Sequence, residues 1–388
     1  MREENSPTVH GEPGEDPETR IRNPSPQRRN AQGGIHLQSH DLILRESKPK
    51  NLESPFSDLE GFLTPNNKFY VRNHFDIPEI SDSSWRLKIE GAIDKPIEIG
   101  IQDIKRMPSH VLTAMLECAG NGRAYLEPKA KGIPWGAGAV SNAEWTGVPL
   151  RDLLSRAGLK PGALEVILEG ADRGTIDEEP KTPGDIHFAR SIPLVKALDD
   201  VFLAYEMNGE VLTPEHGRPL RAIVPGWYGM ASVKWLSRIV VTDRHFNGYF
   251  QTLEYSIFER HSGIPTLVPL AENAVKAEIA RPAMGESVLR GGEYRVLGAA
   301  WAGESMVRQV EVSVDDGEHW QLARLLGDPV RHAWTLWDWF WRVPERAGHY
   351  RLMARATDAR DRTQPDHRNE DLRTVMIHHV VPIEVQVK

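Results

Sequence analysis

Cysteine is nearly absent from this chain: Cys118 is the only one in 388 residues. A single cysteine excludes an intrachain disulfide, a zinc ribbon, a cysteine-ligated iron–sulfur cluster and a covalently attached c-type haem. No apolar run approaches the ~20 residues that a membrane-spanning helix needs. The start, Met-Arg-Glu-Glu-Asn, has neither the apolar segment of an export signal nor a twin-arginine leader. We therefore expect a protein without a membrane span, located in the cytoplasm, or in the periplasm if a leader was removed.

The chain also has no excess of basic over acidic residues. The net charge is −8, from 55 acidic and 47 basic residues. No overall field therefore attracts nucleic acid or an anionic membrane, and we expect neither as a partner. The hydrophobic share of 40% and the charged share of 26% are ordinary for a globular protein. The length is sufficient for two domains.

The N-terminal two thirds of the chain divide into two parts by composition. Residues 1–45 are expected to form a disordered or extended arm, because residues 1–35 are polar and rich in Pro and Gly. A partner-binding tail is the alternative. Residues 46–265 combine many short strand patterns with a few helices, which indicates an α+β domain rather than regular βαβ alternation. Within them, residues 150–157 predict a helix and residues 68–75 predict a strand.

Residues 266–388 show a different pattern, in which apolar and polar side chains alternate. Six segments predict strands: 294–301, 307–314, 319–325, 334–343, 348–356 and 381–387. Asp315-Asp316-Gly317 is typical of a hairpin turn. These strands predict a β-sandwich of immunoglobulin-like size, without the cysteine pair of antibody domains. The tryptophan-rich run at 334–341 is expected to alternate between the sandwich core and an interface.

The setting of Cys118 is unusual for a core cysteine. Residues 111–116 predict a strand, and the thiol follows where this strand ends in the turn Ala119-Gly120-Asn121-Gly122-Arg123. A thiolate there would be stabilised by Arg123 and by free backbone N–H groups. An inert, buried cysteine is the alternative, since free cysteine is among the most buried residue types. The local sequence leaves both interpretations open.

Several separate motifs together resemble one family. They are Phe69-Tyr70-Val71-Arg72-Asn73-His74, Cys118-Ala119-Gly120-Asn121, Glu169-Gly170-Ala171-Asp172, Ala204-Tyr205-Glu206-Met207-Asn208-Gly209, His216-Gly217 with Arg221, Val233-Lys234-Trp235-Leu236 and Asp315-Asp316-Gly317-Glu318-His319-Trp320. In this order they resemble the sulfite oxidase family of molybdenum enzymes, whose catalytic domain is shared with eukaryotic nitrate reductase. The resemblance covers about residues 50–388. It implies a sulfite-oxidase-type molybdopterin-binding domain over 46–265 and an immunoglobulin-like dimerisation domain over 266–388.

The resemblance implies molybdenum with molybdopterin as the cofactor, and no haem. Cys118 would bind the metal directly, since a soft sulfur ligand suits a metal that cycles through two electrons. Arg221 and Lys234 would suit the pterin phosphate, and Asp172 the pterin ring N–H groups. The complete set of implied cofactor contacts is Tyr70, Val71, Arg72, Asn73, His74, Cys118, Asp172, His216, Arg221, Ser232, Val233 and Lys234.

For the substrate, the resemblance implies arginines, a tyrosine and a tryptophan close to the metal ligand. With Cys118, the implied catalytic residues are Arg72, Arg123, Arg373, Trp135 and Tyr255. Arginine side chains match the geometry of a small oxyanion. Tyr255 is preferred to Tyr249 because of its spacing from Lys234. Two positions depart from the family pattern: Gly122, where animal enzymes carry an arginine, and Ser256, where a lysine is usual.

The implied reaction is the oxidation of sulfite to sulfate by oxo transfer at the cysteine-ligated molybdopterin centre. With no haem domain in the chain, electrons would pass to a separate acceptor such as a cytochrome c, and the second domain would form a homodimer. Two alternatives stay open. One is an enzyme of this fold acting on another oxyanion or S-oxide, nitrate-reductase-like or in the reducing direction; the other is a binding protein that has lost its cofactor. His378-His379 has no match in the family pattern and is expected to be structural.

Overall fold

The computed structural model describes residues 41–388. The expectation for residues 1–40 therefore lies outside the described residues. A hairpin of β1 (Ile43–Ser47) and β2 (Lys50–Glu53) comes first, so that β1 begins inside the range predicted for the arm. Within residues 41–388, no helix is long and apolar enough to cross a membrane.

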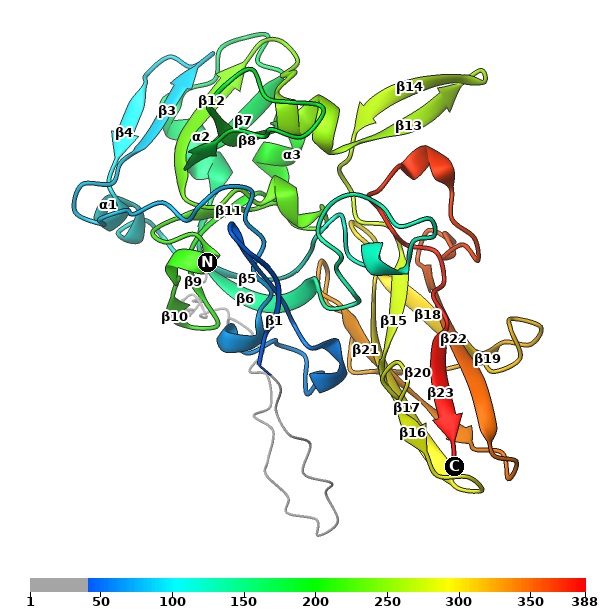
Figure 1. The fold of residues 1–388 in the computed structure, drawn as a ribbon. Helices are drawn as coiled ribbons and strands as arrows, with labels where there is room; N and C mark the ends of the chain where they lie inside the picture. The colour runs from blue at the N-terminus through cyan, green and yellow to red at the C-terminus, as the bar shows by residue number, and fades with distance from the viewer. Residues whose placement is uncertain (1–40) are drawn as a thin grey trace, which may run out of the picture. The chain divides into compact units, whose positions relative to one another are not determined.

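Two five-stranded sheets, the first antiparallel and the second mixed, and a few short helices follow (Figure 1). The first sheet, in the order β10-β9-β6-β5 with β11 on β9, contains β5 (His110–Glu117), β6 (Val140–Pro149), β9 (Phe202–Met207), β10 (Glu210–Val211) and β11 (Arg221–Ile223). The second, in the order β4-β3-β12-β7-β8, contains β3 (Leu87–Gly91), β4 (Ile97–Ile99), β7 (Glu165–Gly174), β8 (Ile186–Pro193) and β12 (Leu236–Thr242). In the second sheet β3 and β12 pair in parallel, whereas β4 pairs with β3 and β7 pairs with β12 in antiparallel fashion. The predicted α+β class is confirmed.

The helices are α1 (Ile101–Lys105), α2 (Leu150–Ala157) and α3 (Leu194–Asp199). In α2 the apolar side chains at spacings of three and four residues lie on one buried face. Gly158 ends α2 with a φ of 70°, a conformation that is easy for glycine. The predicted helix at 150–157 is therefore confirmed with its bounds.

The predicted strand at 68–75 is wrong. The structure places the turn η2 (Asn66–Lys68) there, and Val71 makes one bridge with Leu52. The backbone of Asn73 is satisfied by a side chain, since its N–H donates to Asn51 Oδ1 (2.7 Å) and its carbonyl accepts from Asn51 Nδ2 (3.2 Å). This irregular backbone lets residues 72–74 all face one cavity, whereas side chains of a strand would alternate between its two faces.

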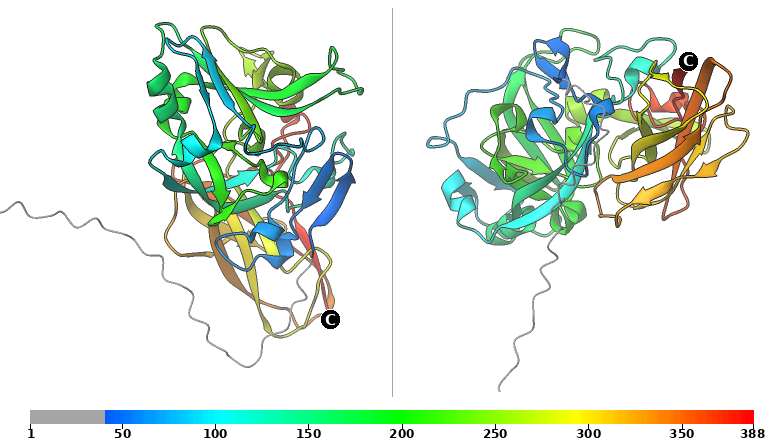
Figure 2. Two further views of the ribbon diagram at one scale, coloured as in Figure 1. Left: turned by 90° about the vertical axis from the view of Figure 1, so that its left-hand side faces the viewer. Right: turned by 90° about the horizontal axis from the view of Figure 1, so that it is seen from below.

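The C-terminal part contains two further sheets, whose strands run from yellow to red in Figure 2. One contains β15 (Lys276–Arg281), β17 (Glu293–Trp301), β21 (Thr335–Arg342) and β20 (Arg324–Leu326). The other contains β16 (Ser287–Val288), β23 (Ile383–Val387), β22 (Gly348–Asp358), β18 (Val307–Ser313) and β19 (Gln321–Leu322). Buried side chains of both sheets form one cluster, so they pack as the predicted sandwich.

Two details of the sandwich bear on the prediction. The alternation in β21 is as expected, because Trp337 and Trp341 are buried while Phe340 is 47% exposed. The strand predicted at 319–325 is split into β19 and β20, which belong to different sheets. The break lies at Ala323, whose N–H still donates to Val310 O of β18 (2.9 Å). The following strand, β20, pairs with β21 of the other sheet.

A two-stranded ribbon of β13 (Ser256–His261) and β14 (Ile264–Pro269) joins the two parts of the chain (Figure 1). Its turn consists of Ser262 and Gly263, both with positive φ (52° and 83°), which suits a tight hairpin. The two parts also share a buried apolar cluster, in which Met115 of β5 packs with Trp301 of β17. The strand that leads to Cys118 is therefore packed against the sandwich.

Candidate functional site

Cys118 lies at the end of β5, in a turn that its neighbours hold tightly. Its N–H donates to Ala139 O (2.8 Å), and its carbonyl accepts from Asn121 N (2.9 Å). Gly122 has a φ of 92°, which favours glycine. The guanidinium of Arg123 folds back over Gly120, where a Cβ would lie 2.5 Å from Nη2. The small residues of this turn therefore allow the guanidinium of Arg123 to pack closely against the backbone that follows Cys118.

Cys118, only 6% exposed, lines a cavity whose empty space, including the part open to solvent, is about 640 Å³. The cavity collects residues from most of the predicted motifs, although they are far apart in the sequence. Its lining is Phe69, Tyr70, Arg72, Asn73, His74, Leu116, Cys118, Ala119, Asp172, Phe188, Glu215, His216, Arg221, Gly229, Met230, Ser232, Val233, Lys234, Trp235 and Tyr255. This arrangement brings the predicted metal ligand together with most of the predicted cofactor contacts.

Asp172 reaches the cavity because β7 is irregular. The register of β7 with β8 shifts between Glu169 and Arg173, which is a β-bulge that redirects the side chains between them. Burial raises the pKa of Asp172 to about 7, against the lowering effect of nearby Lys234. Asp172 Oδ1 is buried and has no hydrogen-bond partner among residues 41–388. A buried acceptor of this kind is expected to have a partner, so a ligand donor is the natural one.

Two buried cations line the same cavity. Arg221 donates to His216 O and Ser232 O (3.2 Å each), yet its buried Nε has no partner in the described part of the chain. Burial lowers the pKa of Arg221 to about 10. Lys234 donates to Glu215 O (2.8 Å) and to Asn73 Oδ1, and burial, together with Arg221, lowers its pKa well below the usual value. Two desolvated cations that line one cavity favour the binding of an anionic ligand between them.

Tyr255 forms the other side of the cavity with two residues of the 72–74 segment. Its hydroxyl lies 2.6 Å from His74 Nε2 and accepts from Arg72 Nη2 (3.4 Å). Burial, with Arg72 nearby, lowers the pKa of His74 well below its usual value, so its imidazole is neutral at pH 7. Burial also raises the pKa of Tyr255 to about 12, although Arg72 opposes this effect. Tyr249, the other tyrosine considered, donates to Pro180 O (2.6 Å) and does not line this cavity.

Four predicted residues are not among those that line the cavity. Val71 bridges to Leu52, and Trp135 is fully buried in the apolar core beside it. Arg123 donates to Thr374 O (3.0 Å) and Ile133 O (3.1 Å). Arg373 donates to Ser256 O and Leu253 O (3.0 Å each), directly beside the Tyr255 segment. Both arginines are thus near the site, with their guanidinium groups bonded to backbone carbonyls.

Some lining residues were missed by sequence reasoning. Gly229 and Met230 belong to the loop that starts at Pro225, whose glycines were a usable signal. At Gly229 a Cβ would lie 2.7 Å from the Tyr70 hydroxyl, so only glycine fits beside it. Phe188 stacks on His74 with ring centroids 4.3 Å apart. Nothing in the local sequence of β8 distinguishes Phe188 from an ordinary core residue.

Comparison with known proteins agrees with this geometry. The family described as oxidoreductase molybdopterin binding domain matches residues 74–250, and the Mo-co oxidoreductase dimerisation domain matches residues 269–386. The mitochondrial sulfite oxidase of Drosophila melanogaster is 39% identical over 354 residues, covering 85% of this chain and 60% of the relative. The sulfite oxidase of Gallus gallus is 37% identical, with 84% of this chain and 73% of the relative covered. The chain thus spans about three fifths of the fly relative.

Other relatives carry different names. A nitrate reductase [NADH] of Ulva prolifera is 32% identical, covering 84% of this chain and 41% of the relative. Among solved structures, the sulfane dehydrogenase SoxCD from Paracoccus pantotrophus has a TM-score of 0.75 and 27% identity, with 90% of each chain covered. Both family matches and the similarity to sulfite oxidases over 84–85% of this chain lead to one conclusion. This chain belongs to the sulfite oxidase family of molybdopterin-binding oxidoreductases.

Proposed function

We propose that this protein is a molybdenum-dependent enzyme that oxidises sulfite to sulfate and passes the electrons to a separate acceptor, such as a cytochrome c. One observation carries the proposal: a buried cysteine opens into a cavity that also holds a tyrosine and three cationic side chains, Arg72, Arg221 and Lys234. A thiol beside fixed cations suits a soft metal ligand next to an anion site. The proposal also agrees with the names of the relatives, which include sulfite oxidases.

The residues present fit molybdopterin with its phosphate. Cys118 offers the thiolate for molybdenum, Arg221 Nε is an unused donor for an anion, and Asp172 Oδ1 is an unused acceptor for a ring N–H. When bound, the cofactor would supply the two-electron oxo-transfer chemistry. The whole proposed contact set is Tyr70, Val71, Arg72, Asn73, His74, Cys118, Asp172, His216, Arg221, Ser232, Val233 and Lys234. Of these, Val71 has its backbone bonded to Leu52 and would act by holding Tyr70 and Arg72 in place.

The chain's own groups have definite tasks in this reaction. Arg72 holds a positive charge beside the Tyr255 hydroxyl, and both would bind and orient the sulfite anion. Neutral His74 fixes the direction of the Tyr255 hydroxyl by its 2.6 Å contact. Arg123, Arg373 and Trp135 stay proposed substrate-site residues, although none of them lines the cavity and both arginines donate to backbone carbonyls.

Assembly and acceptor are part of the proposal. A homodimer through residues 266–388 is supported by the match to a dimerisation domain. We propose no haem in this chain, since it has a single cysteine and no segment that resembles a cytochrome domain.

A second function is favoured by specific relatives. The same cavity cations would bind other small oxyanions, and the similar proteins include a nitrate reductase and a sulfane dehydrogenase. Under this alternative the protein acts on another oxyanion or S-oxide, including in the reducing direction. Its test is turnover of nitrate or an S-oxide with a reduced viologen dye as electron donor.

The decisive experiment measures molybdenum content and sulfite turnover on one purified sample, with ferricyanide or cytochrome c as acceptor. We expect about one molybdenum per chain and sulfite-dependent reduction of the acceptor, as implied by one cysteine ligand per site. Cys118→Ser should abolish turnover while the protein stays folded. Molybdenum without sulfite turnover would favour the second function, and active Cys118→Ser protein would refute the assigned metal ligand.

A further inference from the structure

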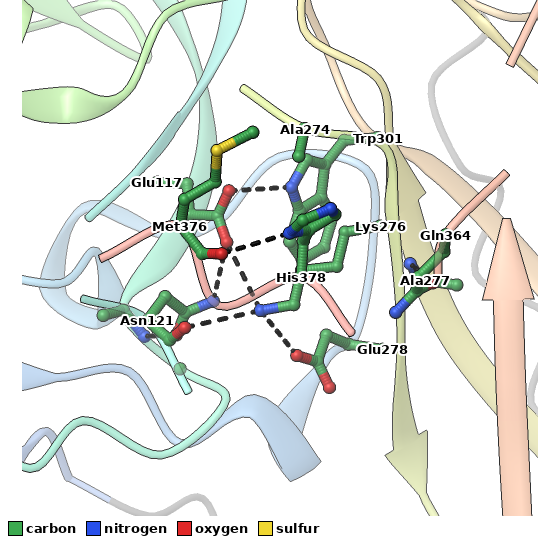
Figure 3. Close-up of polar contacts among 12 residues, drawn as sticks. Glu117, Asn121, Ala274, Lys276, Ala277, Glu278, Trp301, Gln364, Met376 and His378 are labelled. Carbon is green, nitrogen blue, oxygen red and sulfur yellow. Dashed lines mark hydrogen bonds and ion pairs between the residues drawn. The ribbon is translucent and has the colours of Figure 1, made fainter. Parts of the chain in front are cut away.

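The residue before Cys118 carries a buried carboxylate with an unusual number of partners. Glu117 is 2% exposed, and four donors converge on its two oxygens. They are Asn121 Nδ2 (3.2 Å), Asn273 Nδ2 (3.0 Å), Trp301 Nε1 (2.9 Å) and Lys276 Nζ (3.4 Å). Figure 3 labels three of these partners, Asn121, Lys276 and Trp301, around Glu117, with dashed lines for the contacts among the residues drawn. All four partners are donors, so the geometry fits an ionised carboxylate that only accepts.

The partners come from two parts of the chain. Asn121 belongs to the Cys118 turn, whereas Lys276 lies on β15 and Trp301 on β17, both in the sandwich. Lys276 is 1% exposed and sits between Glu117 and Glu278, whose Oε1 lies 2.9 Å from Nζ. Burial opposes the charged form of Lys276, but Glu278 and Glu117 outweigh it and raise the pKa. A charged, fully buried lysine thus links the sandwich to the residue next to the thiol.

The same turn is held a second time by the C-terminal part. Lys276 Nζ also donates to Asn121 O (3.5 Å), and Asn121 Oδ1 accepts from Ala139 N (3.0 Å), the residue that bonds Cys118 N. On the other side, Met376 N donates to Ala119 O (2.7 Å). The residues before and after Cys118 are therefore held by contacts from the sandwich strands β15 and β17 and from the segment between β22 and β23, and not by β5 alone.

Buried ion pairs are weak contributors to net stability, because desolvation offsets much of the attraction. They do, however, select one geometry, since a shift that breaks the pair leaves a buried charge without a partner. The Glu117–Lys276 network lies beside the proposed metal ligand. Its role is therefore better explained as fixing the position of the Cys118 sulfur than as adding to the free energy of unfolding.

We propose that Lys276 and Glu117 are positioning residues, through which the C-terminal sandwich sets the place of the Cys118 sulfur in the cavity. The inference rests on the proposed function, in which that sulfur binds molybdenum. Neither residue lines the cavity, so neither is a catalytic residue. The dimerisation domain would then be a structural part of the metal site.

The test uses the fact that Cys118 is the only thiol of the chain, so that its alkylation rate in cofactor-free protein reports one position. Lys276→Gln leaves Glu117 and Glu278 buried without their cation, and should raise the rate roughly tenfold or more through local opening. Glu117→Gln leaves Lys276 paired with Glu278, so a smaller rise is expected. Molybdenum retained after purification should fall in the same order of variants.

Lys196→Gln is the matched control. Lys196 is also a buried lysine between two carboxylates, Asp200 (3.0 Å) and Glu304 (2.8 Å), but it does not contact the Cys118 turn. Rates are compared in low urea at matched stability, where local opening shows a weak urea dependence and global unfolding a strong one. We expect faster alkylation in Lys276→Gln than in this control.

A spectroscopic measurement completes the test. In loaded Glu117→Gln enzyme, the electron paramagnetic resonance signal of partly reduced molybdenum should differ from that of the wild type, because the sulfur position has changed. Alkylation rates that equal the wild type, or that only follow those of Lys196→Gln, would overturn the inference. If Lys276→Gln does not fold, Glu117→Gln decides by the same two readouts. Failure of the proposed function is seen separately, as wild-type protein that contains molybdenum but does not turn over sulfite.

Discussion

Arg190 offers a sharp test of how the Tyr255 side of the cavity is held. Its guanidinium, on β8, is 1% exposed and has no carboxylate partner among the contacts of the described residues. It donates to Phe250 O, at the start of the π-helical turn η6 (Phe250–Glu254), and to Leu270 O (2.8 Å), just after β14. Leu270 N in turn donates to Tyr255 O (2.9 Å). Arg190 therefore ties together both ends of the segment that carries Tyr255.

Two opposing effects decide the outcome of Arg190→Met. Each hydrogen bond from a charged donor contributes about 1.5–3 kcal/mol, so losing both would destabilise by about 3–6 kcal/mol. Burial lowers the pKa of Arg190 from its ordinary value to about 10, which corresponds to about 3 kcal/mol of desolvation penalty that the substitution relieves. We therefore expect a fall in the free energy of unfolding of about 0–3 kcal/mol. The Tyr255 segment, in contrast, loses one of its two arginine anchors, because only the bonds from Arg373 to Leu253 O and Ser256 O remain.

The assay combines urea unfolding of cofactor-free protein with steady-state sulfite kinetics. We expect kcat/KM to fall about tenfold, which corresponds to about 1.4 kcal/mol of transition-state stabilisation, with a modest loss of stability. Arg173→Met is the control, because Arg173 of β7 pairs with Asp185 on the surface (Arg173 side chain 59% exposed) and its replacement should leave stability nearly unchanged. Unchanged kcat/KM in Arg190→Met, or stability lost by more than about 5 kcal/mol, would refute this reasoning.

Three further predictions address other groups. Tyr255→Phe should lower kcat/KM by about tenfold or more, because the hydroxyl bonded to His74 is lost, whereas Tyr249→Phe should leave sulfite kinetics unchanged. Lys234→Met should raise the Tm of cofactor-free protein, since burial disfavours this cation, yet lower the molybdopterin retained after purification. Burial lowers the pKa of His332 to about 4, so the unfolded state binds the extra proton between about pH 4 and 6.5. The free energy of unfolding should therefore rise with pH in that window, by up to about 1.4 kcal/mol per pH unit, and His332→Gln should flatten this slope in urea titrations.

Part of the cavity was predictable because its residues occur in short motifs with a local structural meaning. Cys118 follows a strand that sequence alternation predicts, and the structure places that strand at residues 110–117. The segment 70–74 was predicted as cofactor contacts but with the wrong secondary structure, because alternation cannot detect a backbone satisfied by the Asn51 side chain. Arg123 and Arg373 were assigned by position, and their bonds to backbone carbonyls could not be inferred from it.

The sequence by itself determined the class of the protein: mostly strands with few helices, an all-β C-terminal part, one thiol and a family-specific order of motifs. Only the tertiary structure decided how those motifs meet. The bulge in β7 that turns Asp172 into the cavity depends on pairing with β8, and the contact of Lys276 with Glu117 joins residues 159 positions apart. Such contacts follow from the packing of whole sheets, which no local pattern of residues encodes.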